Sequence, residues 1–119
     1  MSGIVALVGV DGAPVDARLL AEMTAALSFR GPDAQRTWSE GSVGMGHALL
    51  ATTPEARREA QPGALDGVWI TADIRMDGRD ALRAALRAQG GRDLDAATDV
   101  ELLLHAYRAW GESCVDRIL

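Results

Sequence analysis

The amino-terminal end of the chain places the strongest limit on its fold. Aliphatic and β-branched residues cluster from Ile4 to Val10, directly before the turn-forming pair Asp11-Gly12. This pattern predicts a buried strand that begins almost at the first residue, so we expect an ordered amino terminus. The apolar stretch is short and no basic segment precedes it, which is unlike a secretion signal. We therefore expect a cytoplasmic protein.

Length, charge and cysteine content exclude several classes of protein. A chain of 119 residues, 48% hydrophobic and 24% charged, supports one small domain with a single core. No apolar run approaches the roughly 20 residues that a membrane span needs, so no membrane partner is expected. The net charge is -5 and the basic residues are arginines dispersed among acids, so nucleic acid is not an expected partner. The single cysteine, Cys114, excludes an internal disulfide and a cysteine-rich metal site, and we expect it to be a small buried residue.

The first half of the chain carries signals for a helix and a hairpin. Apolar residues repeat at helical spacing between Asp16 and Leu27, which predicts an amphipathic helix with an acid at its start. The segment Arg30-Gly31-Pro32-Asp33 ends this helix, because proline cannot continue it. Residues Thr37 to Ser39 and Val43 to His47 flank a tight glycine-containing connection and predict a hairpin.

The middle of the chain predicts a loop, a strand and a helix in succession. Polar residues and prolines between Thr52 and Gly67 indicate a long surface loop. A strand is predicted from Val68 to Ile74. A helix is predicted from Asp77 to Gln89, where Gly90-Gly91 ends it.

The last helix has the clearest local signal. Thr98-Asp99-Val100-Glu101 is a capping box, and apolar residues follow it at helical spacing until Gly111. Residues 113–119 predict a further helical or turn segment. Trp38, Trp69 and Trp110 stand far apart in the sequence, so we interpret them as core residues and not as a stacking platform.

Four short segments, taken in order, resemble the class II glutamine amidotransferase domain of asparagine synthetases. They are Met1-Ser2-Gly3-Ile4-Val5, Phe29-Arg30-Gly31-Pro32-Asp33, Gly44-Met45-Gly46-His47, and Thr98 to Tyr107 followed by Trp110-Gly111. The resemblance spans nearly the whole chain, residues 1–119. It implies an α+β fold of the N-terminal-nucleophile hydrolase type, a four-layer αββα sandwich of which this chain would form an incomplete front part.

The resemblance also implies a nucleophile at the second residue, activated by its own α-amine once the initiator methionine is removed. Here that residue is Ser2, whereas amidotransferases of this family have cysteine there. A thiolate attacks far more readily than a hydroxyl unless a base activates the hydroxyl strongly. Ser2 is therefore the candidate catalytic residue, and its alternative role is that of a small residue at a strand start.

Two further parts of the family's site are replaced. The family builds an oxyanion hole with an asparagine-glycine pair followed by glutamate, and the matching segment here is Thr71-Ala72-Asp73, in a chain that contains no asparagine. The family's arginine, which pairs with the carboxylate of glutamine, is matched by Leu49. Asp99 matches the family's contact to the amino group of the substrate, although an acid in the first turn also stabilises a helix without any ligand.

Other polar residues are weaker candidates. Asp73 and Arg30 are candidate substrate-binding residues, although Arg30 can equally order its turn by hydrogen-bonding to Asp33 or to backbone carbonyls. His47 and His105 lie beside apolar residues and are interpreted as structural.

These replacements lead to three hypotheses. The first is a degenerate, glutaminase-like domain with a structural or docking role beside an ATP-dependent amide ligase, located downstream or in a separate chain. Residues 73–79 look like the corresponding segment of asparagine-synthetase homologues that no longer use glutamine, among them lasso-peptide cyclases. ATP and Mg²⁺ are expected only for that synthetase domain, with no cofactor and no metal in this chain. The second is a hydrolase that cleaves an amide through Ser2, and the third is a dimeric interaction module, so a homo-oligomer is expected.

Overall fold

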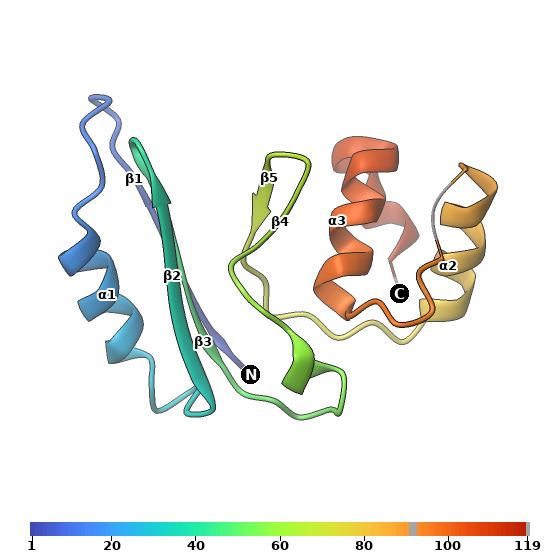
Figure 1. Ribbon diagram of the computed structural model, residues 1–119, viewed down its shortest axis with the longest axis horizontal. Helices are drawn as coiled ribbons and strands as arrows, with labels where there is room; N and C mark the ends of the chain where they lie inside the picture. The colour runs from blue at the N-terminus through green and yellow to red at the C-terminus, as the bar shows by residue number, and fades with distance from the viewer. Residues whose placement is uncertain (91–92, 119) are drawn as a thin grey trace.

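A three-stranded antiparallel sheet forms the amino-terminal part of the protein. In the computed structural model, which describes residues 1–90 and 93–118, the strand order is β1 (Gly3–Val8), β3 (Val43–Leu49), β2 (Ala34–Glu40) (Figure 1). The predicted hairpin is confirmed and is longer than expected, because β2 and β3 pair from end to end. The predicted strand Ile4–Val10 ends at Val8, because β3 begins opposite that residue.

Helix α1 (Ala17–Ala26) covers one face of this sheet (Figure 1). Asp16 starts the helix as predicted, and its carboxylate accepts hydrogen bonds from two backbone N–H groups of the first turn. Close approach of helix and sheet depends on Gly46 of β3, where a Cβ atom would overlap the buried side chain of Thr24. The packing of α1 therefore requires glycine at that position.

A second, two-stranded sheet consists of β4 (Gly63–Leu65) and β5 (Val68–Ile70). Asp66 and Gly67 connect the strands with φ values of 49° and 80°, which is the backbone geometry that an Asp-Gly pair adopts in a tight hairpin turn. The loop predicted over residues 52–67 is therefore wrong at β4 and at the short 3-10 helix η1 (Ala56–Arg58).

The strand predicted over residues 68–74 is also shorter than expected. β5 ends at Ile70 because its partner ends opposite it, at Gly63. Residues 71–76 continue without regular secondary structure. This run, called here the 71–76 segment, lines a cavity described below.

The carboxyl-terminal part consists of α2 (Arg79–Ala88), α3 (Asp99–Trp110) and the 3-10 helix η2 (Gly111–Arg117). The predicted capping box is confirmed, since Thr98 and Glu101 exchange hydrogen bonds between side chain and backbone. The predictions for Gly91 and Leu119 lie outside the described residues. One apolar cluster joins these helices, and its buried members are Met76, Leu82, Leu86, Leu94, Ala97, Leu102, Ala106 and the predicted buried Cys114.

The elements follow one another across the molecule as α1, the three-stranded sheet, the β4–β5 hairpin, α3 and α2 (Figure 1). The fold is thus α+β with antiparallel sheets. Trp38 of β2 and Trp69 of β5 join the two sheets, with ring centroids 4.1 Å apart and planes at 18°. The interpretation of these tryptophans as scattered core residues is wrong, because the two rings stack on each other and both are only half-buried.

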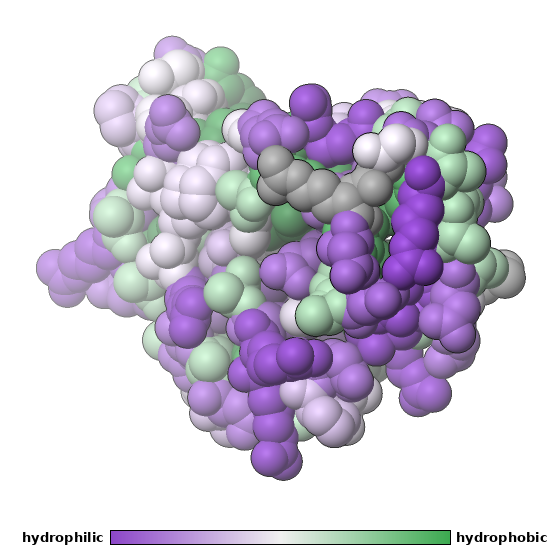
Figure 2. Space-filling model, turned by 45° about the vertical axis from the view of Figure 1, so that its right-hand side comes forward, coloured by the Kyte–Doolittle hydropathy of each residue, from purple (hydrophilic) through white to green (hydrophobic). Residues whose placement is uncertain are grey.

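Hydrophilic residues dominate the face shown in Figure 2, with apolar residues visible between them. Within residues 1–90 and 93–118, no helix has both the length and the apolar character needed to cross a bilayer.

Candidate functional site

A cavity of about 280 Å³ lies where the start of β1, the end of β3, the 71–76 segment and the start of α3 meet. Segments that are far apart in the sequence contribute to it. Its walls are formed by Met1, Ser2, Leu49, Leu50, Thr52, Thr53, Ala56, Glu59, Gln61, Ala72, Asp73, Ile74, Arg75 and Asp99. The fold thus brings together five of the positions singled out from the sequence, which are Ser2, Leu49, Ala72, Asp73 and Asp99.

Ser2 is fixed at the cavity by both its backbone and its side chain. Its backbone nitrogen donates a hydrogen bond to Asp73 Oδ1 at 3.1 Å. Its hydroxyl oxygen accepts a hydrogen bond from the backbone N–H of Leu50 at 3.0 Å. The residue that precedes β1 is therefore bound to two parts of the cavity wall, Leu50 just after β3 and Asp73 in the 71–76 segment.

The 71–76 segment is held largely by side chains. Gln61 lies against the backbone of Ala72, accepting from its N–H at 2.7 Å and donating to its carbonyl oxygen at 3.0 Å. Gln61 is only 4% exposed. Because the side-chain amide forms the same pair of hydrogen bonds that a neighbouring strand would form, Gln61 substitutes for the missing strand partner. Sequence reasoning missed this residue, since no spacing pattern distinguishes it within the predicted loop.

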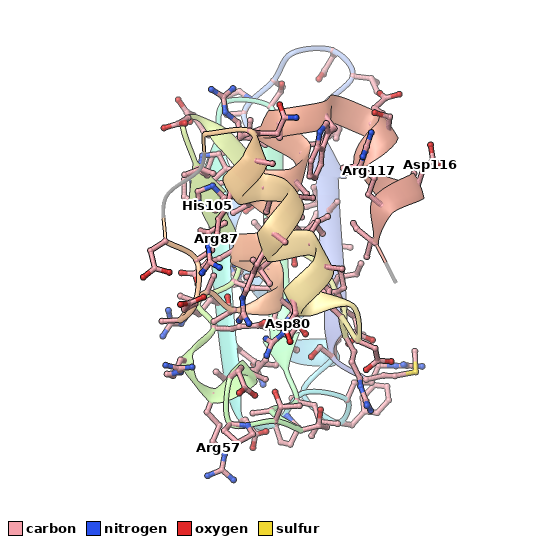
Figure 3. All side chains as sticks on the ribbon, turned by 90° about the vertical axis from the view of Figure 1, so that its right-hand side faces the viewer. Arg57, Asp80, Arg87, His105, Asp116 and Arg117 are labelled. Atoms are coloured by element: carbon pink, nitrogen blue, oxygen red, sulfur yellow. The ribbon has the colours of Figure 1, made fainter. Side chains whose placement is uncertain are left out.

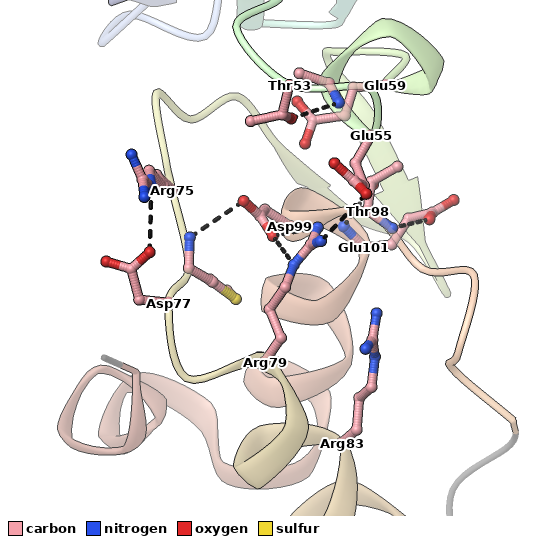
Figure 4. Close-up of polar contacts among 12 residues, drawn as sticks. Thr53, Glu55, Glu59, Arg75, Asp77, Arg79, Arg83, Thr98, Asp99 and Glu101 are labelled. Atoms are coloured by element: carbon pink, nitrogen blue, oxygen red, sulfur yellow. Dashed lines mark hydrogen bonds and ion pairs between the residues drawn. The ribbon is translucent and has the colours of Figure 1, made fainter.

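Asp99 connects the 71–76 segment to α3 (Figure 4). Its Oδ2 accepts a hydrogen bond from the backbone N–H of Met76 at 3.1 Å, and its Oδ1 lies 2.6 Å from the guanidinium of Arg79. The Asp99 and Arg79 side chains are 13% and 22% exposed. A second carboxylate, Glu55, lies 3.9 Å from the same guanidinium. Both oxygens of Asp99 are thus engaged within the chain.

The remaining charges on the cavity wall are mostly acidic. Glu59 is partly buried, and burial raises the pKa of its carboxyl group, while a hydrogen bond from Gln61 opposes that change. Arg75 is a cation on this wall, but it pairs with Asp77 at 3.1 Å and is 79% exposed. The cavity wall is therefore better suited to a cationic or neutral group than to an anion.

His47 of β3 is buried and contacts the start of the 71–76 segment. It is 2% exposed, and its Nδ1 is 3.1 Å from Thr71 Oγ1. Burial lowers the pKa of His47, and the nearby Asp73 carboxylate partly offsets this effect. Its Nε2 is buried and has no hydrogen-bond partner among the residues that the structure describes. His47 thus contacts Thr71, which holds a hydroxyl where the family resemblance implies an amide.

Two other sequence candidates lie away from the cavity. The guanidinium of Arg30 is 5.8 Å from the centre of the Phe29 ring, and Arg30 does not contribute to the cavity wall. Asp33 accepts from the backbone N–H of Ala51 at 2.8 Å. His105 lies on α3, on the side of the molecule that faces the viewer in Figure 3, and lines a separate pocket with Ala64 and Leu65 of β4.

The chain is similar to a known domain family and to a known enzyme. The model of the glutamine amidotransferase domain family matches residues 1–119. Asparagine synthetase [glutamine-hydrolyzing] 3 from Bacillus subtilis (strain 168) is 38% identical over 100 residues, which is 81% of this chain and 16% of that protein. The chain thus spans 16% of the length of this curated relative.

Proposed function

The chain belongs to the glutamine amidotransferase domain family and is related to asparagine synthetase, and we propose that it is a degenerate member that does not hydrolyse glutamine. The observation that carries this proposal is the set of side chains that line the cavity. The cavity gathers the positions matched to the family's site, and they hold the hydroxyl of Ser2, the aliphatic side chain of Leu49 and the methyl of Ala72.

The first reason against glutamine hydrolysis is the attacking group. A serine hydroxyl needs a base to remove its proton, and in this family that base is the free α-amine of the second residue. The nitrogen of Ser2 lies 3.1 Å from the Asp73 carboxylate. A carboxylate at that distance favours the protonated, cationic form of an amine, which cannot accept a proton.

The second reason is that the cavity cannot hold the carboxylate of glutamine. That carboxylate requires a cationic partner, and Leu49 offers only an apolar side chain that is 8% exposed. Asp99, Asp73 and Glu59 surround the same space. The guanidinium of Arg79 is engaged by Asp99. A carboxylate entering the cavity would lose water and meet other carboxylates, so its binding is unfavourable.

The third reason concerns stabilisation of the reacting oxyanion. Thr71 has no amide to donate, and its hydroxyl lies 3.1 Å from His47 Nδ1. Loss of one oxyanion donor typically reduces the rate about a hundredfold or more. Combined with the two preceding losses, this leaves no efficient route to ammonia.

A domain without this reaction retains a structural or docking role. We propose that it serves a cytoplasmic ATP-dependent amide ligase of the asparagine-synthetase type, whose synthetase domain lies downstream or in a separate chain and binds ATP and Mg²⁺. The proposed domain is a four-layer αββα sandwich of the N-terminal-nucleophile type. The order of α1, sheet, hairpin and α3 in Figure 1 supports that arrangement.

Ammonia release from glutamine tests the loss of activity. The unmodified chain is compared with a variant carrying Ser2→Cys, Leu49→Arg, Thr71→Asn and Ala72→Gly, and with a control that has the last three changes but keeps Ser2. We expect background ammonia from the unmodified chain and from the control. Turnover by the unmodified chain that Ser2→Ala abolishes would refute the proposal.

One observation favours a second candidate, a hydrolase that uses Ser2 on another amide. Ser2 lines an open cavity whose carboxylates suit a cationic or neutral substrate. Such an enzyme needs a free Ser2 amine, so intact mass must show that Met1 is absent, and a serine-reactive acylating probe must label Ser2. Absence of labelling in the processed chain contradicts this candidate.

Self-association is a third proposal, based on the edge strand β1. Ile4 and Val8 are 50% and 65% exposed on this strand. An edge strand with exposed apolar side chains can pair with a second copy. Sedimentation should give a dimer, and Ile4→Lys should shift it towards a monomer. A monomer at all concentrations would refute the proposal.

A further inference from the structure

The amino terminus is bound by two groups that belong to different parts of the fold. The nitrogen of Ser2 donates to Asp73 Oδ1, and the hydroxyl of Ser2 accepts from the N–H of Leu50. Met1 precedes this contact and is 78% exposed. Ser2, Leu50 and Asp73 are together called the amino-terminal latch.

We propose that removal of Met1 strengthens this latch by converting the contact between Ser2 and Asp73 into an ion pair. A methionine aminopeptidase hydrolyses the bond between Met1 and Ser2, so that water supplies the hydroxyl of the released methionine and the new hydrogen of the Ser2 amine. A small second residue such as serine permits this processing. The resulting amine takes up a proton and carries a positive charge against the Asp73 carboxylate.

The surroundings favour the ammonium at this place. The amide nitrogen of the unprocessed chain is neutral, whereas an ammonium forms a shorter and stronger charge-assisted hydrogen bond to a carboxylate. Glu59 and Asp99 also line the cavity. The cation on the wall, Arg75, pairs with Asp77 and is largely exposed. The carboxylate of Asp73 is therefore available to the amino terminus.

The latch and catalysis by Ser2 require opposite charge states of the Ser2 α-amine. An ammonium held by Asp73 stabilises the fold, whereas a general base must be neutral. The latch does not depend on the loss of glutaminase activity, because its readouts are stability and amine reactivity and not ammonia. Each proposal can therefore fail without the other.

Thermal unfolding of four proteins tests the proposal. They are the processed chain, the same chain with Met1 retained by inhibiting the aminopeptidase, and both forms of Asp73→Asn, which keeps a hydrogen-bond acceptor but removes the charge. We expect processing to raise Tm by about 3 °C in the unmodified sequence, the size of one exposed ion pair in a small domain. In Asp73→Asn, processing should change Tm little. An equal shift in both sequences, or no shift in either, overturns the latch.

A second measurement uses the absence of lysine from the sequence. Because the sequence has no lysine, the α-amine is the one amino group that an amine-reactive acylating reagent can modify at neutral pH, and the reagent reacts with its neutral form. We expect the processed chain to react about three times more slowly than processed Asp73→Asn, and the difference to shrink at 1 M salt. Equal rates at low salt overturn the proposal, even where a variant changes stability for another reason.

Discussion

The three-stranded sheet and the 71–76 segment are both extended, but they are held in different ways. In the sheet, β3 forms backbone ladders with β1 and β2 from end to end. The 71–76 segment has no strand partner, and side chains distant in sequence take that place. Gln61 binds the backbone of Ala72, and Asp99 binds that of Met76. The difference teaches that single side chains, and not backbone pairing, position the cavity wall.

The largest expected effect comes from a substitution in the three-stranded sheet, the region held by backbone pairing. Gly46→Ala in β3 places a methyl group against Thr24 of α1. Overpacking at such a buried contact should lower the free energy of unfolding by about 3 kcal/mol. Urea denaturation measures this change, and adding Thr24→Ala should restore part of the loss. A Gly46→Ala protein as stable as the original would show that α1 does not press on the sheet as described.

The next largest effect comes from a substitution that removes side-chain support from the 71–76 segment. Gln61→Ala removes both hydrogen bonds to Ala72 and should lower the free energy of unfolding by about 2 kcal/mol. Hydrogen exchange at the amide of Ala72 should become faster. Gln35→Ala, at an exposed position of β2, is the matched control and should change neither quantity. Unchanged exchange in Gln61→Ala would mean that the segment holds itself in place.

A smaller effect comes from the second support. Asp99→Asn keeps the shape of the side chain but removes its charge beside Arg79, and should lower the free energy of unfolding by about 1.5 kcal/mol. The capping residue Thr98 is untouched. Asp77→Asn is the control, because the Asp77–Arg75 pair is exposed and contributes little. Equal losses in both variants would contradict the structural role given to Asp99.

The smallest effect is the pH dependence of Glu59. Burial raises the pKa of this carboxyl group in the folded state. The folded state therefore binds the proton more tightly than the unfolded state, so the stabilising contribution is full below the ordinary value of 4.5 and is lost as pH rises through the folded pKa. Glu59→Gln should be more stable than the original protein at pH 7, and the difference should vanish near pH 4. A difference of opposite sign would show that the ionised carboxylate is favoured in the fold.

Sequence patterns predicted the elements that depend on contacts between residues close in sequence. The capping box of Thr98 and Glu101 and the helix start at Asp16 were predictable because the interacting atoms are close in sequence. β4 was not predicted, since a strand of three residues carries almost no periodicity. The pattern at 68–74 could not reveal that the strand lacks a partner after Ile70.

The same distinction applies to the cavity. The resemblance brought Ser2, Leu49, Asp73 and Asp99 into one group, and the structure places them on one wall, although their proposed roles in binding stay predictions. The wall also includes Gln61, which supports the segment through its contact with Ala72, eleven residues away. Such contacts leave no mark in a single sequence.

The stack of Trp38 on Trp69 gives the protein an internal optical reporter. Two indole rings with centroids 4.1 Å apart share their electronic excitations, so the pair should produce a coupled band in circular dichroism that a separated pair lacks. One ring comes from each sheet. Loss of that band during heating would therefore record the separation of the two sheets directly, independently of helix content and without any added label.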